Sequence, residues 1–183
     1  MEKGYRAVTV ADIVRHAGIA RNTFYENFSS KEDCFLAACD FAANEALSRV
    51  VDAGGKPATW PEMIRAGLGA LLRYIASEPA LARTCIVEAL SAGPAAVERY
   101  ERSIQAFVPF FQRGRKVSRH GDELPETLEE TIVGGIFWIL YQRIVMGQVE
   151  QIEDLLGQLV EFSLTPYIGA ESAKRVAAQA DTG

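Results

Sequence analysis

The chain has 183 residues, of which 49% are hydrophobic and 23% charged, with a net charge of −5 at pH 7. A chain of this size can bury a sizeable core, as one moderate domain or as a small module joined to a larger one. Its longest charge-free apolar run, residues 132–141, is shorter than the roughly 18 residues of a membrane helix, and no signal or transit peptide opens it. We therefore expect a cytoplasmic protein with no membrane partner.

Cysteine and histidine are sparse and scattered. Cys34, Cys39 and Cys85 form no CxxC pair, and His16 stands far from His120. Neither a disulfide framework nor a metal site is indicated, and no cofactor is expected. We interpret the three thiols as small core residues, with reactive redox sensing as the alternative.

The charge is distributed unevenly along the chain. Residues 1–32 carry a net charge of +1, which leaves −6 for the remainder. This mild asymmetry permits a nucleic-acid-binding N-terminal segment without requiring one.

The first predicted elements are helices marked by capping residues. Residues 9–12 have the spacing of a capping box with a shorter acid, and residues 29–32 form a full box, so helices should begin near Val10 and Ser30. Between them Gly18 can end a helix with a positive φ. We predict a helix over 10–16, a turn, a helix over 20–27, and then a longer helix.

The rest of the chain also repeats its apolar residues at helical spacing. No stretch alternates at period two, so we predict an all-α fold with about eight helices. Pro109 should kink one helix, and the apolar pattern fades after Gly169, where we expect the chain to fray. The remaining predicted helices run from residue 31 to a break at 54–57, then over 60–75, 80–92, 95–116, 126–148 and 150–167.

Residues 10–27 have the layout of a helix-turn-helix, whose second helix enters the major groove of DNA. The side chains of Ile19, Phe24 and Phe28 should face inward. Arg21 and Asn22 should face outward, where arginine can pair with guanine and asparagine with adenine. The hydroxyls of Thr23 and Tyr25 and the ammonium of Lys31 can hold phosphates. The alternative is that this surface is only a solvated helix face.

The whole N-terminal segment resembles the DNA-binding domain of the TetR family of transcriptional repressors. The resemblance rests on Thr9-Val-x-Asp-Ile, Ala17-Gly-Ile, Thr23-Phe-Tyr-x-x-Phe28 and Ser30-Lys-Glu32. It implies a helix-turn-helix in residues 1–46, which also include the start of a connecting helix. It further implies a larger helical ligand-binding and dimerisation domain in residues 47–183.

The resemblance also implies two groups of DNA contacts, namely Thr9, Tyr25 and Lys31 to the backbone, and Arg21, Asn22 and Thr23 to the bases. Two residues depart from the family pattern. Ala20 stands where a serine usually caps the second helix, and losing such a cap costs about 1 kcal/mol. Asn22 stands where a small residue is common, which suggests a particular operator preference.

The first helix of the family's three-helix unit is expected to be missing. Residues 2–5 resemble its end, and without its body the inward faces of Ile13, Phe24 and Phe28 should be exposed. Either translation begins at Met1 and the DNA-binding unit is weakened, or the start was placed too late and the natural protein is longer. The otherwise intact motif favours the second explanation.

An aromatic-rich interior suits a largely apolar ligand cavity between the later helices. The Pro109 kink is where we expect room for a ligand, because a broken backbone hydrogen bond lies among several rings. For each residue, ordinary core packing is the alternative. The predicted ligand-binding residues are Met63, Tyr74, Glu88, Phe107, Phe110, Phe111, Trp138 and Tyr141.

The last two long helices suggest a symmetric four-helix dimer interface. Gly135 allows close approach of two helices, and the apolar stripe after it exceeds what one exposed helix should show. The alternative is that this surface packs within one subunit. The predicted interface residues are Gly135, Ile139, Ile152, Leu155, Leu159 and Phe162.

These observations predict a ligand-responsive transcriptional regulator rather than an enzyme. We expect a homodimer that represses from a palindromic, double-stranded DNA operator and is released by a small, largely apolar ligand. The alternative is a dimeric small-molecule-binding protein that has lost DNA binding with its first helix. An enzyme has little support, because the sequence shows no paired base and nucleophile, metal spacing or phosphate loop.

Overall fold

The computed structural model describes residues 4–55 and 59–179, and every regular element within them is helical. The all-α prediction is therefore confirmed. The α-helices are α1 (Val10–Ala17), α2 (Arg21–Asn27), α3 (Lys31–Gly54), α4 (Trp60–Ser77), α5 (Pro79–Ala82), α6 (Pro94–Gln105), α7 (Val108–Gln112), α8 (Leu128–Val145), α9 (Leu156–Ile168) and α10 (Ala170–Ala177). The shorter turns are a π-helix, η1 (Arg83–Val87), and four 3₁₀ segments, η2 (Glu88–Ser91), η3 (Arg113–Lys116), η4 (Gly121–Glu123) and η5 (Val149–Leu155).

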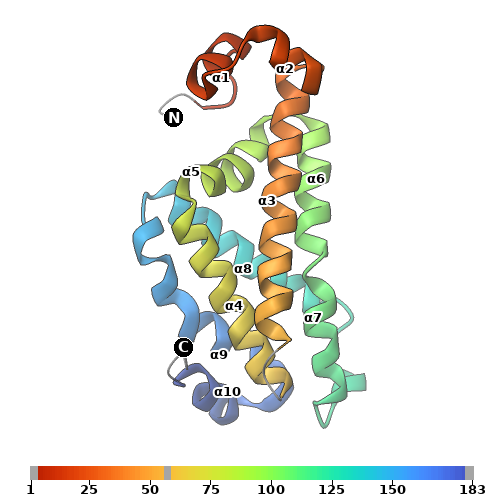
Figure 1. The fold of residues 1–183 in the computed structure, drawn as a ribbon. Coiled ribbons are helices and arrows are strands. Elements are labelled where there is room, and N and C mark those ends of the chain that lie inside the picture. The colour runs from red at the N-terminus through yellow and green to blue at the C-terminus, as the bar shows by residue number, and fades with distance from the viewer. Residues whose placement is uncertain (1–3, 56–58, 180–183) are drawn as a thin grey trace.

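Helix α3 connects the two ends of the molecule. Figure 1 shows α1 and α2 at its N-terminal end, and the remaining helices gathered along its length. The predicted domain boundary at residue 46 falls inside this continuous helix. A change in the surroundings of α3 within the body can therefore reach α1 and α2 without crossing a linker.

The core of the helical body lies where α4, α8 and α9 face one another. Leu72, Leu140 and Leu164 have at most 1% of their surface exposed, and they belong to one continuous apolar cluster. Burying each such side chain contributes about 1.5–3 kcal/mol, so this cluster dominates the stability of the body.

The predicted capping box forms at α1, whereas α3 has only a side-chain cap, one residue later than predicted. At α1, the Thr9 hydroxyl accepts a hydrogen bond from the Asp12 amide at 3.2 Å. The Asp12 carboxylate in turn accepts one from the Thr9 amide. At α3, Ser30 rather than Ser29 is the cap, and its hydroxyl accepts from the Asp33 amide at 3.1 Å. The Ser29 amide and hydroxyl donate to the Asp33 carboxylate, and these bonds lower the pKa of that group.

Pro109 divides the predicted helix over 95–116 into two helices. Helix α6 ends at Gln105, and Pro109 lies in the first turn of α7, where its missing N–H leaves no intrahelical bond unmade. The helix that was expected to kink at Pro109 is therefore broken into two separate helices. This break gives the Phe107 ring, which is only 8% exposed, a place between helices.

The C-terminal region is more regular than expected. The predicted helix over 150–167 begins as the 3₁₀ segment η5 and continues as α9. The expected fraying after Gly169 is wrong, because α10 packs against α9 with Ala173 fully buried. Gly169 has a φ of +80°, which lets the chain reverse between the two helices.

A buried ion pair joins α8 to η3. The Arg115 guanidinium donates to both carboxylate oxygens of Glu129, at 2.8 and 2.9 Å, and the Tyr167 hydroxyl of α9 donates at 2.9 Å. Burial alone would raise the pKa of Glu129, which is 3% exposed, but these hydrogen bonds hold that pKa below its usual value. In its charged form the Glu129 carboxylate therefore links α8, η3 and α9.

Candidate functional site

Helices α1 and α2 are both short and are joined by a tight turn. Gly18 has a φ of +67°, and the Ile19 amide donates to the Val14 carbonyl at 3.1 Å, which closes the turn. Phe24 is 1% exposed and lies under the pair, so its predicted exposure is wrong. The Phe28 and Tyr25 rings contact Phe24, with centroids 5.5 and 5.3 Å away.

The outer face of α2 is polar. Arg21, Asn22, Thr23 and Tyr25 are all exposed. The Arg21 guanidinium lies 5.6 Å from the Tyr25 ring centroid and donates to its hydroxyl at 3.5 Å. As expected, Ala20 gives α2 no side-chain cap. The structure presents these four side chains to solvent together, and their DNA contacts stay a prediction.

Lys31 occupies a different place from the one predicted. Its ammonium donates to the carbonyls of Tyr5 and Val8, both at 2.9 Å, and lies 4.4 Å from the Tyr5 ring centroid. In this arrangement Lys31 holds the segment before α1 onto α3 and is not presented to a phosphate. Thr9 was predicted to contact the DNA backbone, and here its side chain caps α1. Residues 1–3, part of the segment compared with the family's first helix, lie outside the described residues.

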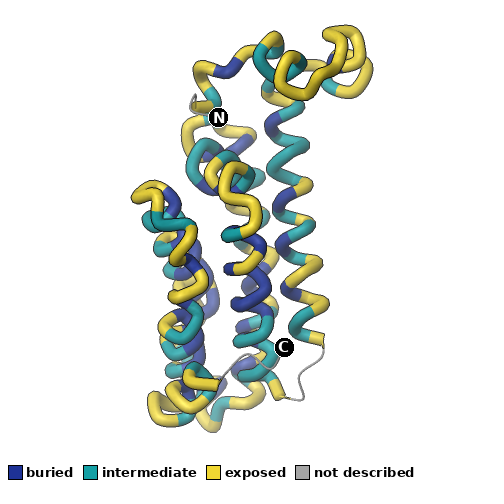
Figure 2. Tube along the Cα trace, turned by 60° about the vertical axis from the view of Figure 1, so that its left-hand side comes forward, coloured by how far each residue is buried: buried dark blue, intermediate teal, exposed yellow. Residues whose placement is uncertain are grey.

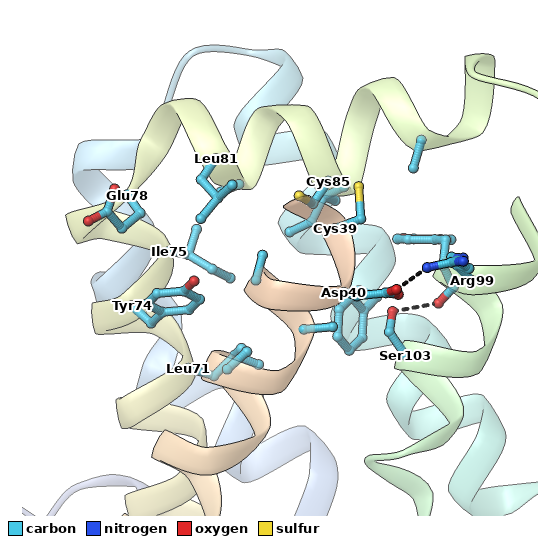
Figure 3. A pocket seen from close by; sticks show the side chains of 18 of the residues that line it. Cys39, Asp40, Leu71, Tyr74, Ile75, Glu78, Leu81, Cys85, Arg99 and Ser103 are labelled. Atoms are coloured by element: carbon cyan, nitrogen blue, oxygen red, sulfur yellow. Dashed lines mark hydrogen bonds and ion pairs between the residues drawn. The ribbon is translucent and has the colours of Figure 1, made fainter. Parts of the chain in front are cut away.

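A partly open cavity lies in the helical body, bounded by α3, α4, the segment 79–91, α6 and α8; its empty volume of about 740 Å³ includes solvent at its mouth, and about 80 Å³ of it can hold the centres of water-sized molecules. Figure 3 shows it from close by. The cavity exists because small side chains line facing helices where large ones would meet. They are Ala42, Ala43, Ala46, Ala82, Ala89 and Ala96.

Tyr74 and Phe107, both predicted to bind ligand, line this cavity. The Tyr74 side chain is 7% exposed, and its hydroxyl finds no hydrogen-bond partner within residues 4–55 and 59–179. Burial, and then the nearby Glu45 carboxylate, raise the pKa of Tyr74, so the hydroxyl remains protonated at neutral pH. An unsatisfied buried hydroxyl costs about 1–3 kcal/mol, and a ligand atom that pairs with it would recover part of this.

A charged pair lies at one side of the cavity. Arg99 of α6 forms an ion pair with Asp40 of α3, as Figure 3 shows, and Glu78 also lines the wall. The remaining lining is mainly apolar. The cavity can therefore hold a mostly apolar molecule with a small number of polar contacts.

The region around Pro109 opens a second, smaller cavity of about 310 Å³. Met63, Phe110 and Phe111 line it, and Phe107 lines both cavities. The predicted room near the break is present, but it is the smaller of the two spaces. Whether these residues touch a ligand stays a prediction.

Three predicted ligand residues lie elsewhere. The Glu88 carboxylate accepts a hydrogen bond from the Tyr5 amide at 3.1 Å and lines a third space, of about 1030 Å³, beneath the segment before α1. Trp138 is 59% exposed and stacks on Tyr141, with ring centroids 5.6 Å apart. Trp138 follows the buried Phe137, and the 100° turn of one helical step rotates it out of the core. The placement of Glu88 and Trp138 in the ligand cavity is therefore corrected, while Tyr141 is half-buried beside Trp138.

The predicted dimer residues divide into two groups. Ile152, Leu155 and Leu159 are 0, 6 and 2% exposed, because η5 and α9 pack against α4 in the same chain. Their assignment to an interface between subunits is wrong. Gly135, Ile139 and Phe162 remain near the surface, and a methyl group placed on Gly135 would stand 3.5 Å from the Phe162 ring.

The outer faces of α8 and α9 expose an apolar stripe. Trp138, Val145, Met146 and Phe162 are 59, 46, 64 and 48% exposed; Trp138 and Val145 lie seven residues apart on one face of α8, and Met146 follows its end. Exposed large apolar side chains that gather in one region are typical of interaction surfaces. The seven-residue spacing of Trp138 and Val145 along α8 is the signal that sequence reasoning did not use.

The cavity also contains residues that the sequence predictions missed. Cys39, Cys85 and the Arg99–Asp40 pair line it. The available signal was a row of small residues on α3, at positions 39, 42, 43 and 46, which repeats at three- and four-residue steps. Such a row leaves space wherever the facing helix is also small.

Comparison with known proteins identifies the N-terminal segment. Residues 1–38 match the family model of bacterial regulatory proteins, tetR family. This segment is therefore similar to the DNA-binding region of that family. Among curated relatives, the chain is 28% identical over 146 residues to the HTH-type transcriptional regulator EthR of Mycolicibacterium smegmatis, a match that covers 79% of this chain and 67% of EthR. The matches to curated HTH-type transcriptional regulators span from 25 to 67% of the length of those proteins.

Several solved structures superpose on most of this chain. The fatty acid degradation regulator FadR of Bacillus halodurans superposes with a TM-score of 0.79 at 15% identity, covering 89% of this chain and 90% of that one. FadR of Bacillus subtilis in complex with stearoyl-CoA superposes with a TM-score of 0.75 at 16% identity, covering 90 and 91%. At these identities the likeness shows the fold: an all-α body with an N-terminal helix-turn-helix.

Two kinds of feature are not found within residues 4–55 and 59–179. No helix there combines the length and apolar character that crossing a membrane requires. Within the same residues, no three His, Cys, Asp or Glu side chains come together as a metal-binding group.

Proposed function

We propose that this protein is a cytoplasmic, ligand-responsive transcriptional regulator that binds a palindromic DNA operator as a homodimer and is released by a small, largely apolar molecule. The observation that carries the proposal is the course of α3. Its N-terminal end follows the TetR-type helix-turn-helix, and its middle forms a wall of the 740 Å³ cavity.

Helix α3 supplies the coupling between the two sites. Ala42 and Ala46 line the cavity on the same helix that begins at Lys31, directly after α2. A ligand that fits the cavity better in one position of α3 shifts the equilibrium toward that position. Moving the two states from mostly bound to mostly released requires a difference in ligand affinity worth about 5 kcal/mol.

The exposed apolar stripe on α8 and α9 is the proposed dimer contact. A two-fold axis beside Gly135 would bring the Phe162 and Trp138 side chains of two copies together and remove them from water. The same axis would place two α2 helices on one face of a DNA duplex. Half-sites one helical turn or a multiple apart would then be recognised.

The ligand class follows from the cavity walls. An apolar chain or ring system suits the alanine-lined space, and one hydrogen-bonding atom suits the unpaired Tyr74 hydroxyl. The superposed FadR of Bacillus subtilis is described in complex with stearoyl-CoA, which makes acyl compounds the first class to test on this chain.

Selection from a random-sequence duplex library, with the purified chain, tests the DNA-binding part. We expect enrichment of an inverted repeat with half-site centres about 10 base pairs or a multiple apart. Within the described part of the segment the exposed arginines are Arg6, Arg15 and Arg21, so these residues of a dimer neutralise few phosphates. The slope of log affinity against log salt should be no steeper than about −5.

A variant pair localises the contact. Arg21→Ala should weaken binding and relax the preference at one base position, by about 1–3 kcal/mol. Arg119→Ala removes an exposed arginine outside the helix-turn-helix and should leave binding unchanged. Equal effects of both substitutions, or no enriched sequence, would contradict the proposed operator binding.

The engagement of Lys31 favours one second function. With its ammonium held by two carbonyls, the segment has one cation fewer for DNA. The alternative is a dimeric small-molecule-binding protein without an operator. Binding of N-phenyl-1-naphthylamine by a chain that enriches no duplex would establish it.

A further inference from the structure

Two cysteines meet in the wall of the cavity between α3, α4 and α6. Cys39 belongs to α3 and Cys85 to η1, two elements that pack against each other, and both side chains line the cavity. The Cys85 sulfur lies 3.9 Å from the carbonyl of Ala38, the residue before Cys39. Figure 3 shows both side chains where α3 passes the segment 79–91.

The two thiols differ in character because each acts on the other. A hydrogen bond from the Cys85 thiol lowers the pKa of Cys39 and outweighs the effect of burial, and the Arg99 guanidinium acts in the same direction. The same bond and burial raise the pKa of the Cys85 thiol. Cys39 therefore loses its proton more readily than Cys85 and is the more suitable attacking group of the two.

Cys85 lies on the least regular turn of the body. Residues 83–87 form a π-helix and residues 88–91 a 3₁₀ turn. π-Turns inside helices occur often at functional sites. Here the wide turn carries Cys85 at its centre, against the turn of α3 that carries Cys39.

We propose that Cys39 and Cys85 are a redox-reactive pair that forms an intramolecular disulfide when the protein meets a hydroperoxide. The Cys39 sulfur attacks the peroxide, the O–O bond breaks, and a sulfenic acid forms on Cys39 with release of water or an alcohol. The Cys85 sulfur then attacks the Cys39 sulfur, the S–O bond breaks, and water leaves as the S–S bond forms. The two thiols lose two electrons and two protons in total, and the peroxide accepts them.

The disulfide changes the cavity as well as the thiols. Its S–S bond is about 2.05 Å long, so it ties η1 covalently to α3. Because both cysteines line the cavity, the bond alters the wall of the space that an apolar ligand would use. The disulfide itself does not depend on DNA binding or on the proposed ligand, so it can be tested without either.

Mass spectrometry of the full chain tests the proposal directly. After treatment with hydrogen peroxide in slight excess, we expect a mass loss of two hydrogen atoms, reversed by dithiothreitol. Trypsin cleaves after Lys and Arg, so residues 32–49 contain Cys34 and Cys39, and residues 84–99 contain Cys85. The two peptides should be recovered as one cross-linked pair, with fragmentation placing the link at Cys39.

Cysteine variants provide matched controls. Cys34 lines the third space rather than the cavity that Cys39 and Cys85 line, and burial raises the pKa of its thiol. Cys34→Ser should therefore cross-link as the wild type does, whereas Cys39→Ser and Cys85→Ser should not. A link through Cys34, or oxidation of the wild type to sulfinic acid without a cross-link, overturns the proposal. Because the wild-type peptides locate the link by themselves, a variant that folds poorly leaves the test intact.

Discussion

Helix α1 contains no buried residue and α2 only Phe24, whereas α4 of the helical body is buried along most of its length. Figure 2 shows the contrast, with α1 and α2 mainly exposed and the inner faces of the body buried. The small unit is maintained by caps, a glycine turn and the contacts of Phe24. The body is maintained by its apolar core and by the Glu129 ion pair.

The contrast shows where each region keeps its function. The polar residues of α2 face solvent, so they can meet a large partner such as DNA. In the body the Tyr74 hydroxyl faces inward, so it can meet only a molecule small enough to enter. One helix, α3, belongs to both regions and carries the proposed signal between them.

The largest expected effect concerns the body. Glu129→Ala leaves the Arg115 guanidinium and the Tyr167 hydroxyl without their shared carboxylate, and losing hydrogen bonds to a charged group costs about 1.5–3 kcal/mol. The free energy of unfolding, from urea titration followed by circular dichroism, checks this. Glu130→Ala, the exposed neighbour, should change it by less than about 0.5 kcal/mol. Equal effects of the two substitutions would show that the pair does not anchor the body.

A smaller effect separates stability from binding inside the body. Tyr74→Phe removes a buried hydroxyl that has no partner within the described residues, so stability should stay equal or rise. Affinity for the fluorescent probe N-phenyl-1-naphthylamine, whose amine can pair with the hydroxyl, should fall by about 1 kcal/mol. Tyr141→Phe, on the outer face near Trp138, is the control. Unchanged probe affinity in Tyr74→Phe would remove this hydroxyl from the ligand site.

The smallest effect concerns the helix-turn-helix. Ala20→Ser supplies the cap that α2 lacks and should stabilise that helix by about 0.5–1 kcal/mol. Hydrogen exchange of the α2 amides should slow, while amides of α4 should be unaffected. Slower exchange in both helices would indicate that the two regions unfold together, contrary to the comparison.

The local features of the N-terminal segment could be predicted from sequence. Caps, the Gly18 turn and the outward face of α2 depend on residues within a few positions of one another. Lys31 could not be placed in this way, because its carbonyl partners at Tyr5 and Val8 are more than 20 positions away. The displaced cap at Ser30 shows that even a local motif leaves an uncertainty of one residue.

In the helical body, the sequence predicted where the helices lie along the chain better than it predicted which surfaces pack against them. The apolar stripe of Ile152, Leu155 and Leu159 was correct as a buried face, but sequence could not tell a partner subunit from the same chain. The cavity was harder still. Its space arises from small residues on separate helices, and only the packing of α3 against η1 brings Cys39 and Cys85 together.

The central claim is that occupancy of the cavity controls the helix-turn-helix. The most direct test measures fluorescence anisotropy of the selected duplex bound to this chain while N-phenyl-1-naphthylamine is added. The account predicts release of DNA over the concentration range in which the probe binds, and, by linkage, weaker probe binding when DNA is present. Probe binding with no change in DNA anisotropy would contradict it.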